Sequence, residues 1–251
     1  MSRNFDILLK AGGAAESGRV AAPPSPSPSR EAGGRARPRE LHDLIGDEVM
    51  KLVQRVFILP GAAQAPGAVT FAGVDHGAGC SWVCAHASEV LADQVTGTVC
   101  IVDANLRAPS LHEHFRFSNG TGFAEAMKGS KPMHEYARRA SGSQLWLITA
   151  GETGKEPNGA LNPTRLRARI GELRDEFDFV LLDTPAIHSY GDAALLAQVT
   201  DGIILVVGSH TTRREPARMA KESMEAAGVP ILGAVLNKRT FPMPEVIYRN
   251  L

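Results

Sequence analysis

The sequence predicts an α/β fold, a doubly wound and mostly parallel sheet flanked by helices, preceded by a disordered N-terminal tether. Three observations indicate this fold. Strand and helix patterns alternate from residue 68 to residue 237. Two of the strand patterns, Val180–Leu182 and Ile203–Val207, are uniformly apolar, as expected of strands covered by helices on both faces. The first 40 residues have a different composition from the rest of the chain.

The chain of 251 residues therefore divides into two predicted parts. In residues 1–40, Met1–Ala11 has the pattern of a short amphipathic helix, either a fraying terminus or a docking peptide. Gly12–Arg39 is rich in Gly, Ala, Pro, Ser and Arg and cannot bury enough apolar area to offset the entropy of ordering, so it is expected to be a flexible tether. Residues 41–251 are expected to form one domain.

The elements of this domain follow from their periodicity and from Gly or Pro at their ends. The first helix has apolar residues at helical spacing and stops before Pro60 and Gly61. The expected helices cover Glu40–Phe57, Ser81–Gln94, Phe123–Lys128, Asn162–Asp175, Asp192–Gln198 and Glu215–Ala227. The expected strands, each a short apolar run, cover Ala68–Gly73, Thr98–Asp103, Leu145–Thr149, Phe179–Asp183, Gly202–Gly208 and Ile231–Asn237.

Composition narrows the classes of partner and location. The 27 basic and 27 acidic residues cancel, so no overall positive field favours binding to nucleic acid. The cysteines, Cys80, Cys84 and Cys100, have no paired spacing and the chain begins without a secretory leader, which indicates reduced thiols in the cytoplasm. No apolar run approaches the roughly 20 residues that cross a bilayer. We expect a cytoplasmic protein that can still dock on a membrane partner.

A Gly-rich loop lies between the first predicted strand and the helix that follows it. The stretch Thr70–Trp82 runs from strand through turn to helix, as a phosphate-binding loop does. Gly77 and Gly79 would allow a tight turn and close approach of the backbone to phosphate, and Ser81 would supply a hydroxyl for Mg²⁺. However, Cys80 occupies the position where such loops carry lysine. The sequence therefore predicts a nucleotide site and at the same time casts doubt on its catalysis.

Carboxylates end two of the apolar strands. Asp103 ends one and is followed by Asn105 and Arg107, while Asp183 ends another and begins the sequence Asp-Thr-Pro. The carboxyl ends of parallel strands meet at one edge of the sheet, where ligands of such folds bind. An aspartate at the tip of a buried strand commonly organises Mg²⁺. The alternative is that either aspartate caps a helix or turn.

Five segments in this order resemble a known family. They are Gly77–Ser81, Asp103–His112, Gly122–Gly129, Asp183–Pro185 and Leu236–Lys238. Together they look like the bacterial tyrosine kinases of exopolysaccharide and capsule loci, the CpsD/CapB group, which is a branch of the MinD/ParA-like P-loop ATPases. The resemblance runs from about Glu48 to Lys238, and Asp103–His112 is its most specific part.

The resemblance implies binding of ATP or ADP with Mg²⁺. The residues expected to contact the nucleotide are Gly77, Ala78, Gly79, Cys80, Ser81, Trp82, Asn105, Arg107 and Asn237. Asn237 would recognise adenine; Ser81, Asp103 and Asp183 would hold the metal, and the two aspartates would be catalytic. The partner that the resemblance implies is a membrane-anchored polysaccharide chain-length or export protein, which would hold the chain at the inner face of the plasma membrane. Self-association as a homo-oligomer is left open.

The chain also departs from the family pattern. Cys80 removes a positive charge from the phosphate site, and loss of such a contact typically costs about 3–4 kcal/mol, or roughly 10²–10³ in rate. Asn105 stands where the family has a second aspartate and so removes a negative charge. Together, the changes at Cys80 and Asn105 leave the net charge of the site unchanged. The family's C-terminal tyrosine cluster is reduced to Tyr248, and Glu48–Gln54 lacks the arginines used for ring assembly. These changes are compatible with retained binding and weakened chemistry.

Other cations could replace the missing lysine. Arg107, His76 and Lys238 are candidates, although each residue type is more often structural or exposed. Lys155 imitates a second phosphate loop, but Glu156 follows it where Ser or Thr is required, which favours an ordinary loop.

The cysteines and histidines offer further candidate chemistry. Cys80 at a helix N-terminus could be a redox thiol with a lowered pKa, although a disulfide with Cys84 one turn later would be strained and a packing role is favoured. His86, His112 and His114 have no zinc-like spacing, so no transition metal is expected.

The sequence leaves two functions open. One is a regulatory nucleotide-binding protein with little or no phosphoryl transfer. The other is an active tyrosine autokinase or ATPase of the same pathway. A third, less specific alternative is an α/β domain that binds another phosphorylated ligand.

Overall fold

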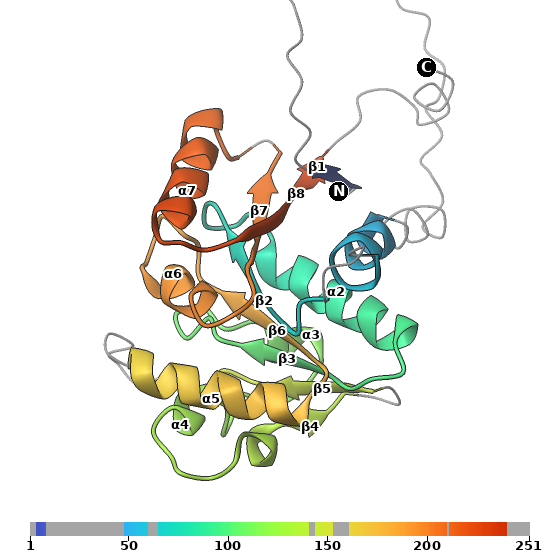
Figure 1. Ribbon diagram of the computed structural model, residues 1–251, viewed down its shortest axis with the longest axis vertical. Helices are drawn as coiled ribbons and strands as arrows, with labels where there is room; N and C mark the ends of the chain where they lie inside the picture. The colour runs from blue at the N-terminus through green and yellow to red at the C-terminus, as the bar shows by residue number, and fades with distance from the viewer. Residues whose placement is uncertain are drawn as a thin grey trace, which may run out of the picture.

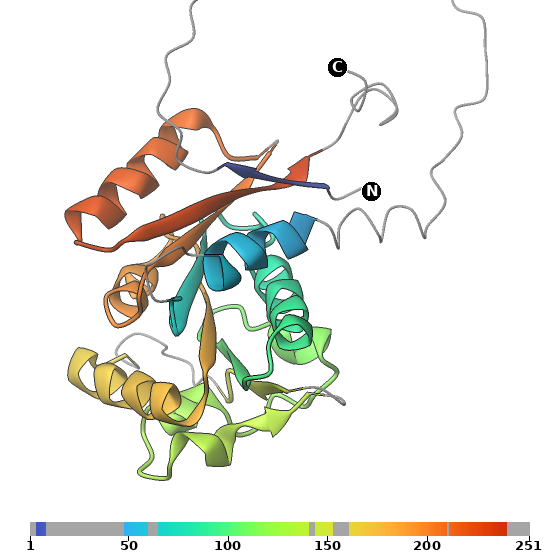
Figure 2. The same ribbon diagram turned by 45° about the vertical axis from the view of Figure 1, so that its right-hand side comes forward.

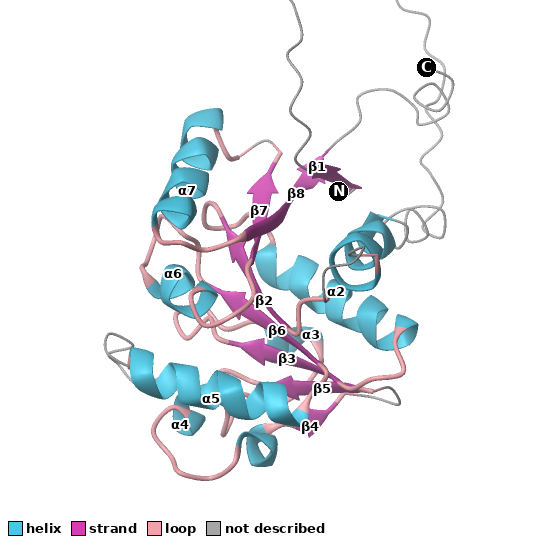
Figure 3. Cartoon of the chain, viewed as in Figure 1, coloured by secondary structure: helices cyan, strands magenta, loops and turns pink. Residues whose placement is uncertain are grey.

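The computed structural model describes residues 4–8, 48–59, 65–140, 144–152, 161–209 and 211–239. Helices lie on both faces of one sheet (Figures 1 and 3). The strands are β1 Asn4–Leu8, β2 Ala68–Gly73, β3 Val99–Asp103, β4 Arg138–Arg139, β5 Leu145–Ile148, β6 Phe179–Thr184, β7 Ile203–Gly208 and β8 Ile231–Arg239. The helices are 48–53, continued by the π-helix η1 Gln54–Ile58, then α2 Cys80–Gln94, α3 Leu111–His114, α4 Phe123–Ala126, the 3-10 helix η2 Met133–Tyr136, α5 Pro163–Glu176, α6 Asp192–Ala197 and α7 Arg214–Ala226.

The sheet has eight strands in the order β1-β8-β7-β2-β6-β3-β5-β4. The six strands from β8 to β5 in this order are parallel, while β1 and β4 pair antiparallel at the two edges. The strand before the Gly-rich loop, β2, is central, with β6 and β7 as its neighbours. The predicted fold class, a doubly wound and mostly parallel sheet flanked by helices, is confirmed.

The expected helix at the N-terminus is wrong for residues 4–8. These residues form β1, which pairs antiparallel with β8. A helix of this length is unstable alone because nucleation is costly, whereas the edge of β8 offers backbone hydrogen-bond partners. The predicted tether Gly12–Arg39 lies outside the described residues, as do positions 40–47 of the first predicted helix.

The strands predicted from Ala68 onward are all present, with ends within two residues of those expected. The sequence reading missed α3, η2 and β4, which are too short to show a periodic pattern. None of the helices in the described ranges is long and apolar enough to cross a bilayer.

Alternate residues of each strand pack on opposite layers of helices, which Figure 2 shows on the two sides of the sheet. Ile101 and Leu181 belong to the core shared with α2 and with helix 48–53. Their neighbours Val102 and Leu182 pack on the other side, with residues of α4 and α5. The alternation therefore places Asp103 and Asp183, two residues further along β3 and β6, on the face covered by α2.

Candidate functional site

The Gly-rich loop connects β2 to α2 at the carboxyl edge of the sheet. Gly77 and Gly79 have φ angles of +78° and +85°, a region that glycine adopts readily and most other residues avoid. Gly79 is the N-cap of α2, a helix of 15 residues, and as a glycine it has no side chain to cap the helix. A helix terminus that binds an anion likewise leaves its N–H groups to the ligand.

Two side chains of β8 hold the carbonyl side of this loop. Asn237 donates from Nδ2 to the carbonyl of Ala78 at 2.8 Å, and Lys238 donates from Nζ to the carbonyl of Gly77 at 2.5 Å. Because each peptide unit is planar and trans, a carbonyl turned toward β8 turns the next N–H away from β8. The N–H group of Gly79 is thereby oriented away from β8. A Cβ atom at Gly79 would collide with Asn237 Nδ2, so this position requires glycine.

Asn237 has a structural role that the sequence reading missed. Its side chain is buried, and its Oδ1 accepts a hydrogen bond from the backbone N–H of Lys238 at 2.7 Å. Both ends of the amide are therefore engaged within the protein. The role of Asn237 in adenine recognition stays a prediction.

Asp103 and Asp183 lie side by side in the sheet. They are register partners of β3 and β6 and are completely buried. Asp103 Oδ2 accepts hydrogen bonds from the backbone N–H groups of Ser110 and Leu111, at 3.1 and 3.0 Å. This carboxylate therefore holds the start of α3. That is the capping role given in the sequence analysis as the alternative to a metal ligand.

Asp183 is the less satisfied carboxylate of the two. Among the described residues no donor makes a well-formed hydrogen bond to either of its oxygens, although the Ser81 hydroxyl and the Cys80 thiol lie near enough to lower its pKa. Burial outweighs these contacts and raises the pKa of Asp183 from 3.8 to about 6. Burial and the neighbouring Asp183 raise the pKa of Asp103 to about 8. A buried carboxylate with unsatisfied oxygens, next to a serine hydroxyl, suits a hard divalent cation such as Mg²⁺.

The Cys80 thiol is protonated in this environment. Burial, and then the negative charge of Asp183, raise its pKa well above the ordinary value. The expected helix-terminus effect on a redox thiol is therefore outweighed, and both Cys80 and Cys84 are free thiols. The lysine position is thus occupied by a neutral side chain directed at Asp183.

Arg107 and Trp82, two of the predicted nucleotide contacts, interact with other side chains of the protein. Arg107 donates from Nε to Asp192 at 2.9 Å, and its guanidinium lies 3.7 Å from the centroid of the Tyr190 ring. Trp82 stacks on His86 with ring centroids 3.8 Å apart. The roles of Arg107 and Trp82 at a nucleotide stay predictions. His76 is exposed, while Lys155 and Tyr248 lie outside the described residues.

Much of the Asp103–His112 segment has a structural explanation. Asn105 accepts a hydrogen bond at Oδ1 from the backbone N–H of Ala108 at 3.2 Å, which closes the turn after β3. Leu106 and Leu111 are buried in the two cores. The turn residue Asn105 therefore lies beside Asp103, and its backbone N–H also donates to Asp103 Oδ1 at 3.3 Å.

A glycine-rich loop at the start of a helix, beside the aspartate of the adjacent parallel strand, defines a P-loop protein of the MinD/ParA-like class. Residues 67–226 match the family model described as cellulose biosynthesis protein BcsQ. Tyrosine-protein kinase YwqD of Bacillus subtilis is 30% identical over 161 residues, which are 64% of this chain and 68% of YwqD. The chain belongs to the bacterial tyrosine-protein kinase family of these P-loop proteins. It spans 60% of the length of the putative tyrosine-protein kinase CapB of Staphylococcus aureus and 19% of that of tyrosine-protein kinase etk of Escherichia coli.

Solved structures show the same fold. The kinase domain of Escherichia coli tyrosine kinase ETK has a TM-score of 0.72 at 23% identity and covers 80% of this chain and 79% of the ETK chain. The septum site-determining protein MinD from Pyrococcus horikoshii, solved in complex with Mg-ADP, has a TM-score of 0.58 at 20% identity, with 66% of this chain and 68% of MinD covered.

Proposed function

We propose that this chain binds ATP or ADP with Mg²⁺ at the Gly77–Ser81 loop, transfers phosphoryl groups weakly or not at all, and regulates a partner protein. One observation carries the proposal. Side chains of β8 donate hydrogen bonds to two carbonyls of the Gly-rich loop, yet the lysine position holds the neutral Cys80 thiol. The glycine-rich turn and the start of α2 would supply backbone N–H groups to phosphate, while the charge that stabilises the transferred phosphoryl group is missing.

The residues of the site would act as follows. The N–H groups at the start of α2 would bind the phosphates, with the helix dipole favouring their negative charge. Ser81, Asp183 and Asp103 would hold Mg²⁺, which would neutralise charge between the phosphates. The complex of MinD with Mg-ADP supports this choice of ligand for a protein of the same fold.

The proposed regulatory role, in place of autokinase activity, rests on the tyrosines that would be phosphorylated. Among the tyrosines that the structure describes, Tyr136 is buried and Tyr190 packs against Arg107. Neither resembles the clustered C-terminal tyrosines that the family resemblance implies. The matching family model is described as a cellulose biosynthesis protein, which supports a role in polysaccharide synthesis. The partner would be a membrane-anchored chain-length or export protein, contacted at the cytoplasmic face.

A calorimetric titration of the purified chain with ATP and Mg²⁺ tests the binding. We expect saturable heat and a rise in melting temperature at millimolar nucleotide, because a ligand that binds only the folded state stabilises it. Ser81→Ala should weaken binding, whereas Ser223→Ala, an exposed serine of α7, should not. Absence of both heat and thermal shift at millimolar ligand would refute nucleotide binding.

The second candidate is an active autokinase or ATPase, and Lys238 is the observation that favours it. Its ammonium group contacts the loop at the Gly77 carbonyl, and it could supply the missing charge by turning from that carbonyl toward the N–H side of the loop. If so, Lys238→Met should lower the affinity for ATP by roughly 10–100-fold, as expected for loss of a hydrogen bond to a charged group. Lys238→Arg should retain most of the affinity.

Lys221→Met is the matched control, because Lys221 is an exposed lysine of α7 paired with Glu225. Equal affinities for Lys238→Met and Lys221→Met would exclude Lys238 from the site. Phosphotyrosine formation on the wild-type chain at a rate comparable to an active kinase would favour the second candidate over the regulatory one.

A further inference from the structure

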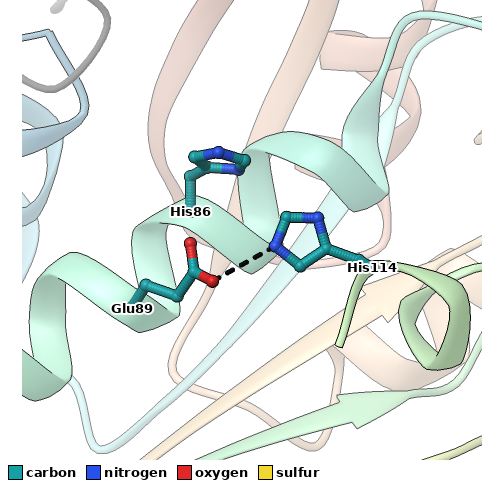
Figure 4. Close-up of side chains that lie close together, drawn as sticks. All are labelled: His86, Glu89 and His114. Atoms are coloured by element: carbon teal, nitrogen blue, oxygen red, sulfur yellow. Dashed lines mark hydrogen bonds and ion pairs between the residues drawn. The ribbon is translucent and has the colours of Figure 1, made fainter. Parts of the chain in front are cut away.

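Three side chains that could ligate a metal meet beside α2, away from the Gly-rich loop. His86 and Glu89 are one turn apart on α2, and His114 comes from α3 (Figure 4). Their ligand atoms all lie within 4.8 Å of one another. Sequence spacing did not indicate this site, because the third side chain reaches α2 only through the packing of α3 against it.

The hydrogen bond of His86 fixes its tautomer. Nδ1 lies 3.0 Å from the backbone carbonyl of Trp82, and a carbonyl can only accept, so Nδ1 carries the proton. In the neutral ring the lone pair is then on Nε2. A metal-binding histidine commonly shows this arrangement, in which a backbone carbonyl orients the ring from behind.

The other two side chains are already at a suitable separation. His114 Nε2 donates to Glu89 Oε1 at 3.3 Å, and a bound ion would take the place of this proton. In a tetrahedral site with metal–ligand distances of about 2.0–2.1 Å, the distance between two ligands is about 3.3 Å. One nitrogen of each histidine and a Glu89 oxygen lie within 4.8 Å of one another, so the site would close around an ion by side-chain movements that bring His86 Nε2 toward it.

Ring contacts restrict two of the three side chains. His86 stacks on Trp82, and His114 contacts both the His86 and the Phe115 rings, with centroids 5.0 and 4.8 Å apart. The side chains are only partly buried, with His114 24% and Glu89 43% exposed, so an ion and a water molecule could enter from solvent. Restricted rings reduce the entropy lost on binding.

We propose that His86, Glu89 and His114 bind a zinc ion, with water as the fourth ligand. Two imidazoles and one carboxylate suit Zn²⁺, whereas Mg²⁺ prefers oxygen ligands in an octahedron. The ion would cross-link α2 to α3. The helix α2 begins at the Gly-rich loop, and Asp103 holds the start of α3. The cross-link would therefore connect the Gly-rich loop to the segment that follows Asp103.

Calorimetric titration of the chelator-treated full chain with Zn²⁺ tests the proposal, together with the visible absorption of the Co²⁺ form. We expect one ion per chain and the intense absorption of four-coordinate Co²⁺. His114→Gln and Glu89→Gln should each weaken the zinc affinity at least about 100-fold, since each removes a direct ligand. Melting curves without metal would show that the variants are folded.

The matched control is His134→Gln, because His134 pairs with Glu176 on the surface in the same way as His114 pairs with Glu89. It should bind zinc as the wild type does. If the cluster is only a surface ion pair, the wild type will bind no zinc, or His114→Gln and His134→Gln will bind it equally. Either result would overturn the proposal.

Discussion

Replacing Cys80 with lysine is expected to raise ATP turnover by about 10²–10³ over the wild type, the effect that one preorganised charge has on such a transition state. Cys80 lies at the first residue of α2 with its thiol toward Asp183, so a lysine there would start from the position that phosphate loops use. Its ammonium would also offset the negative charge of Asp183 and lower the pKa of that carboxyl. Turnover is measured as phosphate released in the presence of Mg²⁺.

Cys80→Met is the control, because methionine has a comparable reach and no charge. It should leave turnover at the wild-type level. An unchanged turnover in Cys80→Lys, with nucleotide binding intact, would mean that the defect lies elsewhere at the edge, with Asn105 as the next residue to change.

Stability is expected to fall as the pH rises from about 4 to about 8. The folded state holds protons on Asp183 and Asp103, whose pKa values are raised to about 6 and about 8, at pH values where the unfolded chain has lost them. Unfolding then releases protons, so the free energy of unfolding decreases with pH across this window. For Asp183 alone, a shift of about 2 units corresponds to roughly 3 kcal/mol.

Asp183→Asn should remove much of this dependence and raise the melting temperature at pH 8, while weakening the binding of ATP with Mg²⁺. Asp93→Asn, at an exposed position of α2, should leave the pH profile unchanged. The measurement is the melting temperature between pH 4 and pH 8. A wild-type melting temperature that is constant or rises over this range would contradict the raised pKa values.

The sheet could be predicted because its strands carry their signal locally. Apolar runs such as Ile203–Val207 are visible in any short window, and the Gly-rich turn together with Asp103 and Asp183 places the site at one edge. The five residues of β1 could not be assigned, because a segment of that length fits helix and strand alike and the edge of β8 decides between them.

The side-chain contacts of the site could not be predicted from the sequence as the strands of the sheet could. The thiol pKa of Cys80 depends on burial and on Asp183, which is about a hundred residues away in the chain. The approach of His114 to Glu89 depends on how α3 packs against α2. A single sequence shows which residue types are present, but no pattern in it reports such distant contacts.

The hydrogen bond from Asn237 to Ala78 spans 159 residues. Synthesis proceeds from the N-terminus at roughly 5–20 residues per second, so β2 and α2 leave the ribosome well before β8. Until β8 docks, the loop lacks the amide and the ammonium that orient its carbonyls. The loop can therefore take the conformation seen here only once β8 is present, and a fragment that ends before residue 231 would keep the loop sequence without the strand that shapes it.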